Sequence, residues 1–208
     1  TPCYDDYAGS GGGLSNPEFI KRLAEGDRGL DSQFSPRAAM RALVFKPPFV
    51  PEREEALLSS MLSIHLGEQA NPGDFVPSPN WPFVAPGVWG SANALSPKYA
   101  GDVSRLFAAE HKVDVLWVRG SHDLAVSDTA ASDPGTLGSM GLIPGWPGPD
   151  VYPPQPMLGQ IRNVLERYAT AGGSYREVVI EATGHVPFLE NVDEFNALLH
   201  AHIGRVQS

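Results

Sequence analysis

The sequence predicts an α/β protein, because two buried strands and a helix between them follow one another in the second half of the chain. Residues 113–118 form a short apolar run that ends at Gly120, which is typical of a parallel strand covered on both faces. Residues 175–183 indicate a second such strand, and apolar residues recur at helical spacing over 155–168. Strand, helix and strand together predict a right-handed parallel crossover, which brings the carboxyl ends of both strands to one edge.

Two residues suited to acid–base chemistry follow these strands. Asp123 comes just after the first strand, and His185 comes directly after the second, preceded by Gly184. Open α/β sheets place their catalytic groups at this edge, and a carboxylate that orients an imidazole prepares it for proton transfer. Two alternatives remain open: Asp128 as the acid, and His185 as a structural histidine.

These residues and their neighbours resemble the carboxyl-terminal part of the α/β-hydrolase fold. The resemblance is carried by the runs 118–123 and 184–190 and by the closing helix, and it covers 112–208. In that family the chain order is nucleophile, acid, histidine, so the resemblance implies Asp123 as the triad acid and His185 as the general base, with no cofactor and no metal. Residues 1–111 are similar to the mainly helical cap of some members. The expected division is therefore a cap region over 1–111 and the carboxyl-terminal part of the core over 112–208.

The nucleophile has no good candidate in the sequence. A G-x-S-x-G elbow needs a buried strand before the serine, and polar residues precede both Ser10 and Ser139. Thr1 would have to head a buried strand to act as an amino-terminal nucleophile, and residues 2–6 do not have that pattern. The resemblance therefore implies that the nucleophile lies before Thr1, on an N-terminal chain of the same precursor. Proteolytic processing would then give a heterodimer in which that chain completes the sheet, because two strands alone make no stable doubly wound sheet.

The chemistry that the resemblance implies depends on this nucleophile. A serine predicts a hydrolase for an ester, lactone or amide with a small, apolar substrate. An aspartate nucleophile predicts epoxide hydrolysis or dehalogenation instead, since one fold hosts several reactions. A non-catalytic binding subunit is the alternative from a different class.

Helix signals are clear in several parts of the chain. Asn16 and Pro17 predict a capped helix that ends near Ala24. The other predicted helices run from Pro36 to about Val44, from Glu52 to Leu66, from Pro97 through Phe107, and from about Glu190 as the closing helix, in which Val192, Phe195, Leu199 and Ile203 are expected to be buried.

Two long stretches, 71–97 and 124–154, are irregular in sequence and rich in proline and glycine. Loops of this length are usually functional or disordered, and the second leaves the predicted sheet beside Asp123, so we expect it to border the active site. Four aromatic residues in these loops are candidates for lining an apolar substrate pocket, with loop anchoring as the alternative: Trp81, Phe83, Trp89 and Trp146.

The composition of the chain argues against several classes of binding partner. The net charge of -9, without a basic stripe, argues against a nucleic-acid partner. No apolar run approaches the length of a membrane span, so we expect a soluble protein whose compartment stays open, with the cytoplasm favoured over secretion. Four of the six histidines, His65, His111, His200 and His202, have no ligand-like spacing around them, so no metal site is expected. The lone Cys3 is expected to be an unpaired thiol unless it bonds to another chain.

Overall fold

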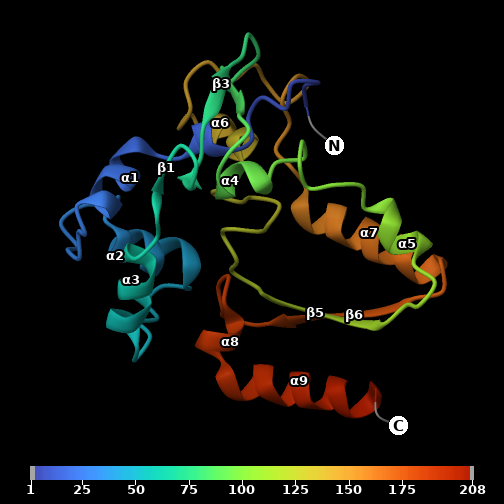
Figure 1. Cartoon of the computed structure of the whole chain (residues 1–208). Coiled ribbons are helices and arrows are strands. Elements are labelled where there is room, and N and C mark those ends of the chain that lie inside the picture. Colours follow the sequence, from blue (N-terminus) through green and yellow to red (C-terminus); the bar gives the residue numbers. More distant parts are fainter. Residues whose placement is uncertain (1–2, 207–208) are drawn as a thin grey trace. The chain divides into compact units, whose positions relative to one another are not determined.

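The computed structural model describes residues 3–206, and Thr1 therefore lies outside the described residues (Figure 1). The chain forms two compact units. The first comprises the chain up to Ala39, Arg53–Gly101 and Asp133–Gln155, and the second comprises Met40–Glu52, Asp102–Ser132 and the chain from Pro156. Both helices and small sheets are present, which confirms the α/β class. The predicted division into cap and core at residue 111 stays a prediction.

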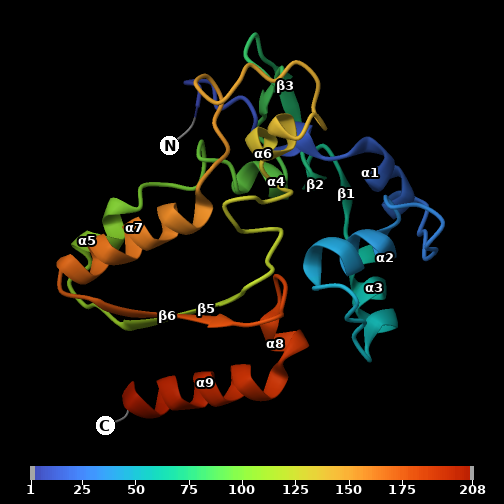
Figure 2. The same ribbon diagram turned by 180° about the vertical axis from the view of Figure 1, so that it is seen from behind.

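The second unit contains the predicted strand, helix and strand. β5 (Asp114–Gly120) pairs in parallel with β6 (Ser174–Ile180), with Val118 opposite Val178. α7 (Met157–Thr170) connects them. Figures 1 and 2 show α7 on one side of the strand pair and α9 (Val192–Val206) on the other, with α8 (Pro187–Glu190) between β6 and α9.

The interior of this unit lies between the strands and α7. Ile180 is fully buried, and Tyr168 is 1% exposed with its hydroxyl donating to the carbonyl of Val113 at 2.7 Å. On the other side of the strands the prediction for the closing helix is partly wrong, because Val192 and Ile203 are about half exposed. Among the described residues the sheet beside α9 has only two strands, β5 and β6, which leave these two side chains partly uncovered.

A charged group ties α7 to the strands. The carboxylate of Glu177 on β6 accepts hydrogen bonds from Arg162 of α7 at 2.8 Å and from Arg119 of β5 at 2.7 Å. These bonds, those from Arg162 first, lower the pKa of Glu177 to about 2, although partial burial opposes the shift.

This shift predicts a pH dependence of stability. The ordinary pKa of 4.5 falls to about 2 in the folded protein, so the stabilisation is present above pH 4.5 and is lost as the pH drops towards 2. We expect Glu177→Gln to lower the free energy of unfolding near neutral pH by about 1–3 kcal/mol, because two arginines lose a charged acceptor. The measurement is urea unfolding between pH 2 and 7. Glu166→Gln, the same charge change on an exposed side chain of α7, is the control. An unchanged pH dependence in Glu177→Gln would contradict the expectation.

In the first unit, the predicted helix at 17–24 is confirmed. α1 (Pro17–Ala24) begins after Asn16, whose side chain accepts the N–H groups of Glu18 and Phe19. The helix predicted from Pro36 is present as α2 (Pro36–Ala39) and continues as the π-helix η2 (Met40–Val44), while α3 (Glu54–Leu62) is shorter than predicted.

The helix predicted from Pro97 through Phe107 is wrong over most of its length. Residues 97–100 form turns, and only α5 (Ser104–Ala108) is helical. Gly101 has φ +80°, a left-handed conformation that no α-helix contains, so the chain turns there before α5 begins.

The two long stretches expected to be irregular contain short elements. The first stretch lies in the first unit and is held by the buried Asn93, which donates to the carbonyls of Asp74 and Trp89 and accepts the N–H of Gly12. The second stretch is divided between the units, with 124–132 in the second and 133–154 in the first. The elements within the two stretches are β2 (Asn71–Pro72), β3 (Phe75–Pro77), β4 (Val84–Pro86), α4 (Ser91–Ala94) and α6 (Pro134–Ser139). Two further short elements, η1 (Gly12–Leu14) and β1 (Leu66–Gly67), come before the stretches in the chain. β1 and β2 are parallel, and β3 and β4 form an antiparallel hairpin. No helix in residues 3–206 combines the length and the apolar character that crossing a membrane requires.

Candidate active site

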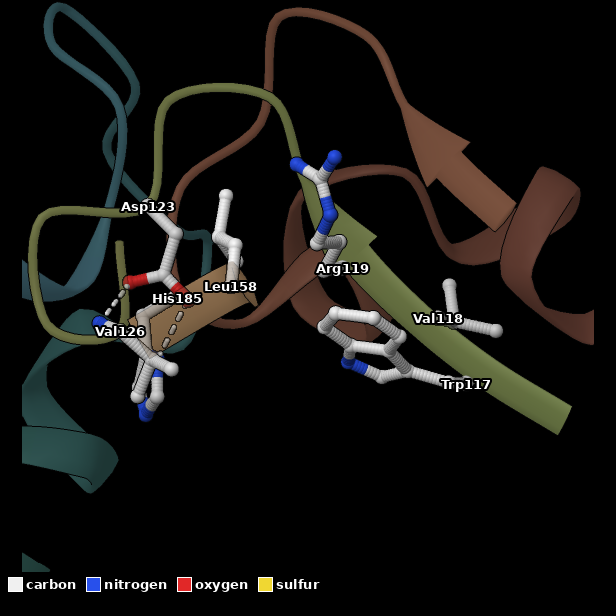
Figure 3. Close-up of a pocket in the computed structure, with 7 residues that line it drawn as sticks. All are labelled: Trp117, Val118, Arg119, Asp123, Val126, Leu158 and His185. Atoms are coloured by element: carbon white, nitrogen blue, oxygen red, sulfur yellow. Dashed lines mark hydrogen bonds and ion pairs between the residues drawn. The ribbon is translucent and has the colours of Figure 1, made fainter. Parts of the chain in front are cut away.

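The structure brings Asp123 and His185 together at the carboxyl ends of β5 and β6. Nδ1 of His185 lies 3.0 Å from Oδ2 of Asp123, as the dashed line in Figure 3 marks. Both residues belong to the second unit, so the contact is internal to one compact body. The parallel pairing of the strands, predicted from the sequence, is what places the two loops side by side.

The carboxylate of Asp123 is held in place by its own loop. Its Oδ1 accepts the N–H groups of Ala125 at 2.7 Å and of Val126 at 2.9 Å, and the side chain is 8% exposed. Oδ2 remains to accept Nδ1–H from His185. In a neutral imidazole this bond leaves Nε2 unprotonated, which is the form that a general base requires.

The strand ends approach each other closely at Gly120. A Cβ at this position would lie 2.0 Å from the carbonyl oxygen of Gly184, so any other residue would force the loops apart. The N–H of His122 donates to the carbonyl of Thr183 at 2.9 Å and joins the two loops directly. His122 itself lies with its Nδ1 2.8 Å from Oγ of Ser121, in agreement with a loop role.

A cavity of about 150 Å³ adjoins this pair. It is lined by Trp117, Val118, Arg119, Asp123, Val126, Leu158 and His185, which are drawn in Figure 3. The volume suits one small group rather than a whole substrate, because complete ligand pockets are several times larger. None of the lining residues carries a hydroxyl or a thiol. The histidine side chain is 41% exposed, so the imidazole is accessible to another group.

The sequence did not identify five of these lining residues as part of the site, among them Trp117, Arg119 and Leu158. Trp117 and Arg119 alternate on the same face of β5, and the guanidinium of Arg119 lies 5.8 Å from the Trp117 ring. Period-two alternation up to Gly120 was the signal that could have placed both near the site. Leu158, in the first turn of α7, had no such signal.

Asp128, the alternative acid, has a different contact. Its Oδ1 accepts the N–H of Leu158 at 2.8 Å, which places the carboxylate at the amino terminus of α7. A carboxylate at this position satisfies a free N–H and opposes the positive end of the helix dipole. The bond that the structure gives to Nδ1 of His185 comes from Asp123.

The two serines considered as nucleophiles lie in the first unit. Oγ of Ser10 donates to the carbonyl of Tyr7 and lies 2.8 Å from Oγ of Ser96, and Oγ of Ser139 donates to the carbonyl of Thr136 inside α6. Within the described residues, neither hydroxyl is hydrogen-bonded to a histidine. Neither serine therefore has the base that would activate it.

The four aromatic candidates also lie in the first unit, and they differ in burial. Trp81 is 4% exposed and its Nε1 donates to the carbonyl of Pro144, while Nε1 of Trp146 donates to the carbonyl of Tyr152. These bonds agree with loop anchoring. Phe83 and Trp89 are more than half exposed. A role of any of the four in substrate binding stays a prediction.

Neither a metal centre nor Cys3 provides a second candidate site among the described residues. The part of the chain that the structure describes contains no group of three or more His, Cys, Asp or Glu side chains that could hold a metal ion. Cys3 is unpaired, and burial raises the pKa of its thiol, which makes it a poor nucleophile.

Comparison with protein-family models, with curated proteins and with solved structures gave no match to this chain. The function is therefore argued from the geometry of Asp123 and His185.

Proposed function

We propose that this chain is the acid- and histidine-bearing part of a hydrolase of the α/β-hydrolase type, which cleaves an ester, lactone or amide through a nucleophile–histidine–acid triad. The observation that carries the proposal is the hydrogen bond between Nδ1 of His185 and the fixed carboxylate of Asp123. The pair lies at the carboxyl edge of parallel strands, where this class of fold performs its chemistry.

The mechanism assigns one role to each residue. Nε2 of His185 accepts the proton of a serine hydroxyl as the oxygen attacks the acyl carbon, and the same proton then passes to the leaving group. Asp123 keeps the imidazole in the required tautomer and stabilises the imidazolium that forms. Trp117, Val126 and Leu158 give the adjoining cavity an apolar wall, which favours an apolar substrate group.

The nucleophile comes from a different segment in this proposal. The cavity beside His185 contains no hydroxyl or thiol among its lining residues, and the exposed imidazole is open to one from outside. We assign the nucleophile to an N-terminal segment or chain of the same precursor.

The same segment would complete the sheet. β5 and β6 pair only with each other among residues 3–206, and most of their side chains are half buried, although their apolar character suits a fully covered sheet. β6 carries Arg176 and Glu177 in its middle, and charged residues are what natural edge strands use against further pairing. The added strand is therefore placed along β5, whose middle is apolar.

The test is labelling of the native assembly with a fluorophosphonate probe, followed by mapping of the labelled peptide. We expect the label on a serine outside residues 1–208, and we expect His185→Ala to lower the labelling rate by at least about 10³-fold. Turnover of substrate without labelling would point to an aspartate nucleophile. Absence of any turnover in an assembly that still binds small apolar esters would point to a binding subunit. Labelling of a serine within this chain would refute the assignment of the nucleophile.

A further inference from the structure

One carboxylate holds the loop that carries His185. Oε1 of Glu190 accepts the N–H of Gly184 at 2.6 Å, and Oε2 accepts the N–H of Lys46 at 2.9 Å. The N–H of His185 itself donates to the carbonyl of Val44 at 2.9 Å. One hydrogen bond therefore joins the histidine loop directly to Val44, and the carboxylate of Glu190 bridges Gly184 and Lys46 with two more. All of these residues belong to the second unit.

Residues 44–46, which the histidine loop contacts, are themselves anchored in the second unit. The side chain of Phe45 is 2% exposed, and its ring lies 5.5 Å from that of Phe49. A Cβ at Gly184 would lie 2.8 Å from the backbone nitrogen of Lys46, so the two backbones are in close contact with no side chain between them. The loop therefore has one position against this segment, set by how Glu190 spans the two N–H groups.

We propose that Glu190 is a positioning residue, which fixes the Gly184–His185 backbone so that Nδ1 of His185 meets Oδ2 of Asp123. The inference rests on the proposed function and adds the residue on which the general base depends. Bonds from N–H groups to an ionised carboxylate are short and strong, and two of them from one carboxylate define a geometry as well as an energy. Partners that orient metal-bound histidines are worth about 10–100-fold in activity, and by analogy we expect an effect of this size here.

Two substitutions separate charge from geometry. Glutamine has the same shape but only one acceptor oxygen, so in Glu190→Gln an NH₂ group faces one of the two N–H donors. Aspartate keeps the charge but is one methylene shorter, so it cannot reach both donors. The matched control is Glu194→Gln, because Glu194 lies on α9 with its carboxylate on the side chain of Asn191.

The main readout is the tautomer of His185, from imidazole ¹⁵N shifts of the native assembly with labelled histidine, assigned by the loss of these signals in His185→Ala. We expect the Nδ1–H form to dominate in the wild type and in Glu194→Gln. In Glu190→Gln and Glu190→Asp we expect a shift towards free histidine, in which the Nε2–H form is the major one. Near-UV dichroism checks that each variant is folded, and Glu190→Asp decides the matter if the glutamine variant is not. Fluorophosphonate labelling of the assembly should fall by about 10–100-fold in both.

Failure of this inference can be told apart from failure of the proposed function. A wild-type tautomer and labelling rate in both folded Glu190 variants would overturn the positioning role and leave the Asp123–His185 pair intact. If His185 of the wild-type protein showed no preference for the Nδ1–H form, its hydrogen bond to Asp123 would be refuted, and both proposals would fail with it. Lower stability of the Glu190 variants with an unchanged tautomer would also overturn the positioning role.

Discussion

Asp123→Asn is expected to lower the turnover of the assembled enzyme by about 10⁴-fold while leaving the fold intact, by analogy with the same change in serine proteases. The asparagine carbonyl can still accept the N–H groups of Ala125 and Val126, as Oδ1 of Asp123 does. Its NH₂ group then faces His185 and can only donate. The imidazole must accept at Nδ1 and carry its proton on Nε2, where it can no longer take one from a nucleophile.

The control is Asp128→Asn, which makes the same chemical change five residues further along the chain. Oδ1 of Asp128 accepts the N–H of Leu158, and an amide oxygen can replace it there, so we expect nearly normal turnover. The measurements are initial rates on a short-chain ester and near-UV dichroism of each variant. Loss of turnover in Asp128→Asn, with normal rates in Asp123→Asn, would transfer the role of the acid to Asp128.

The contact between Asp123 and His185 could be predicted because its signals are local. An apolar run that stops at Gly120 predicts a strand end, and a second run that stops at Gly184 predicts its neighbour. Parallel pairing then brings Asp123 and His185 to one edge without any further information. The 3.0 Å contact between them is a consequence of this topology.

The support around the site could not be predicted, because it consists of contacts between residues far apart in the chain. Lys46 and Glu190 are 144 positions apart, and no local pattern links the backbone of one to the carboxylate of the other. Arg119 and Glu177 meet across 58 positions for the same reason. The helix predicted through residue 101 was wrong although its signal was local, because one glycine in a left-handed conformation outweighs several favourable neighbours.

Burial of the closing helix was also predicted wrongly, and the error is informative. Periodicity shows which side chains of α9 share a face, but it does not show whether anything covers that face. Val192 and Ile203 are about half exposed beside a sheet of two strands. Added strands would supply the missing surface, and the direction of the backbone groups in β5 predicts where they pair.

Leu116→Pro is expected to prevent assembly with the strand-bearing segment, whereas Val179→Pro leaves assembly intact. The N–H of Ser121 donates to the carbonyl of Ile180, so the N–H groups of Arg119 and Trp117, which alternate with it, also face β6. The N–H of Leu116 therefore faces the open edge of β5. By the same alternation the N–H of Val179 faces the outer edge of β6. Each proline removes one outward N–H and leaves the bonds between β5 and β6 in place.

Both substitutions are introduced into the native gene, and assembly is followed by native mass spectrometry and amide hydrogen exchange. In the assembled wild type we expect slow exchange at Leu116 and Val118, at least about 10²-fold slower than in the isolated chain, because an added strand accepts these two N–H groups. Trp117 and Arg119, already bonded to β6, serve as the internal reference. Loss of assembly in Val179→Pro alone would place the added strand along β6. Normal assembly of both variants, with fast exchange at Leu116 and Val118, would mean that no strand joins this sheet, and the nucleophile would then have to reach His185 from a segment that does not extend it.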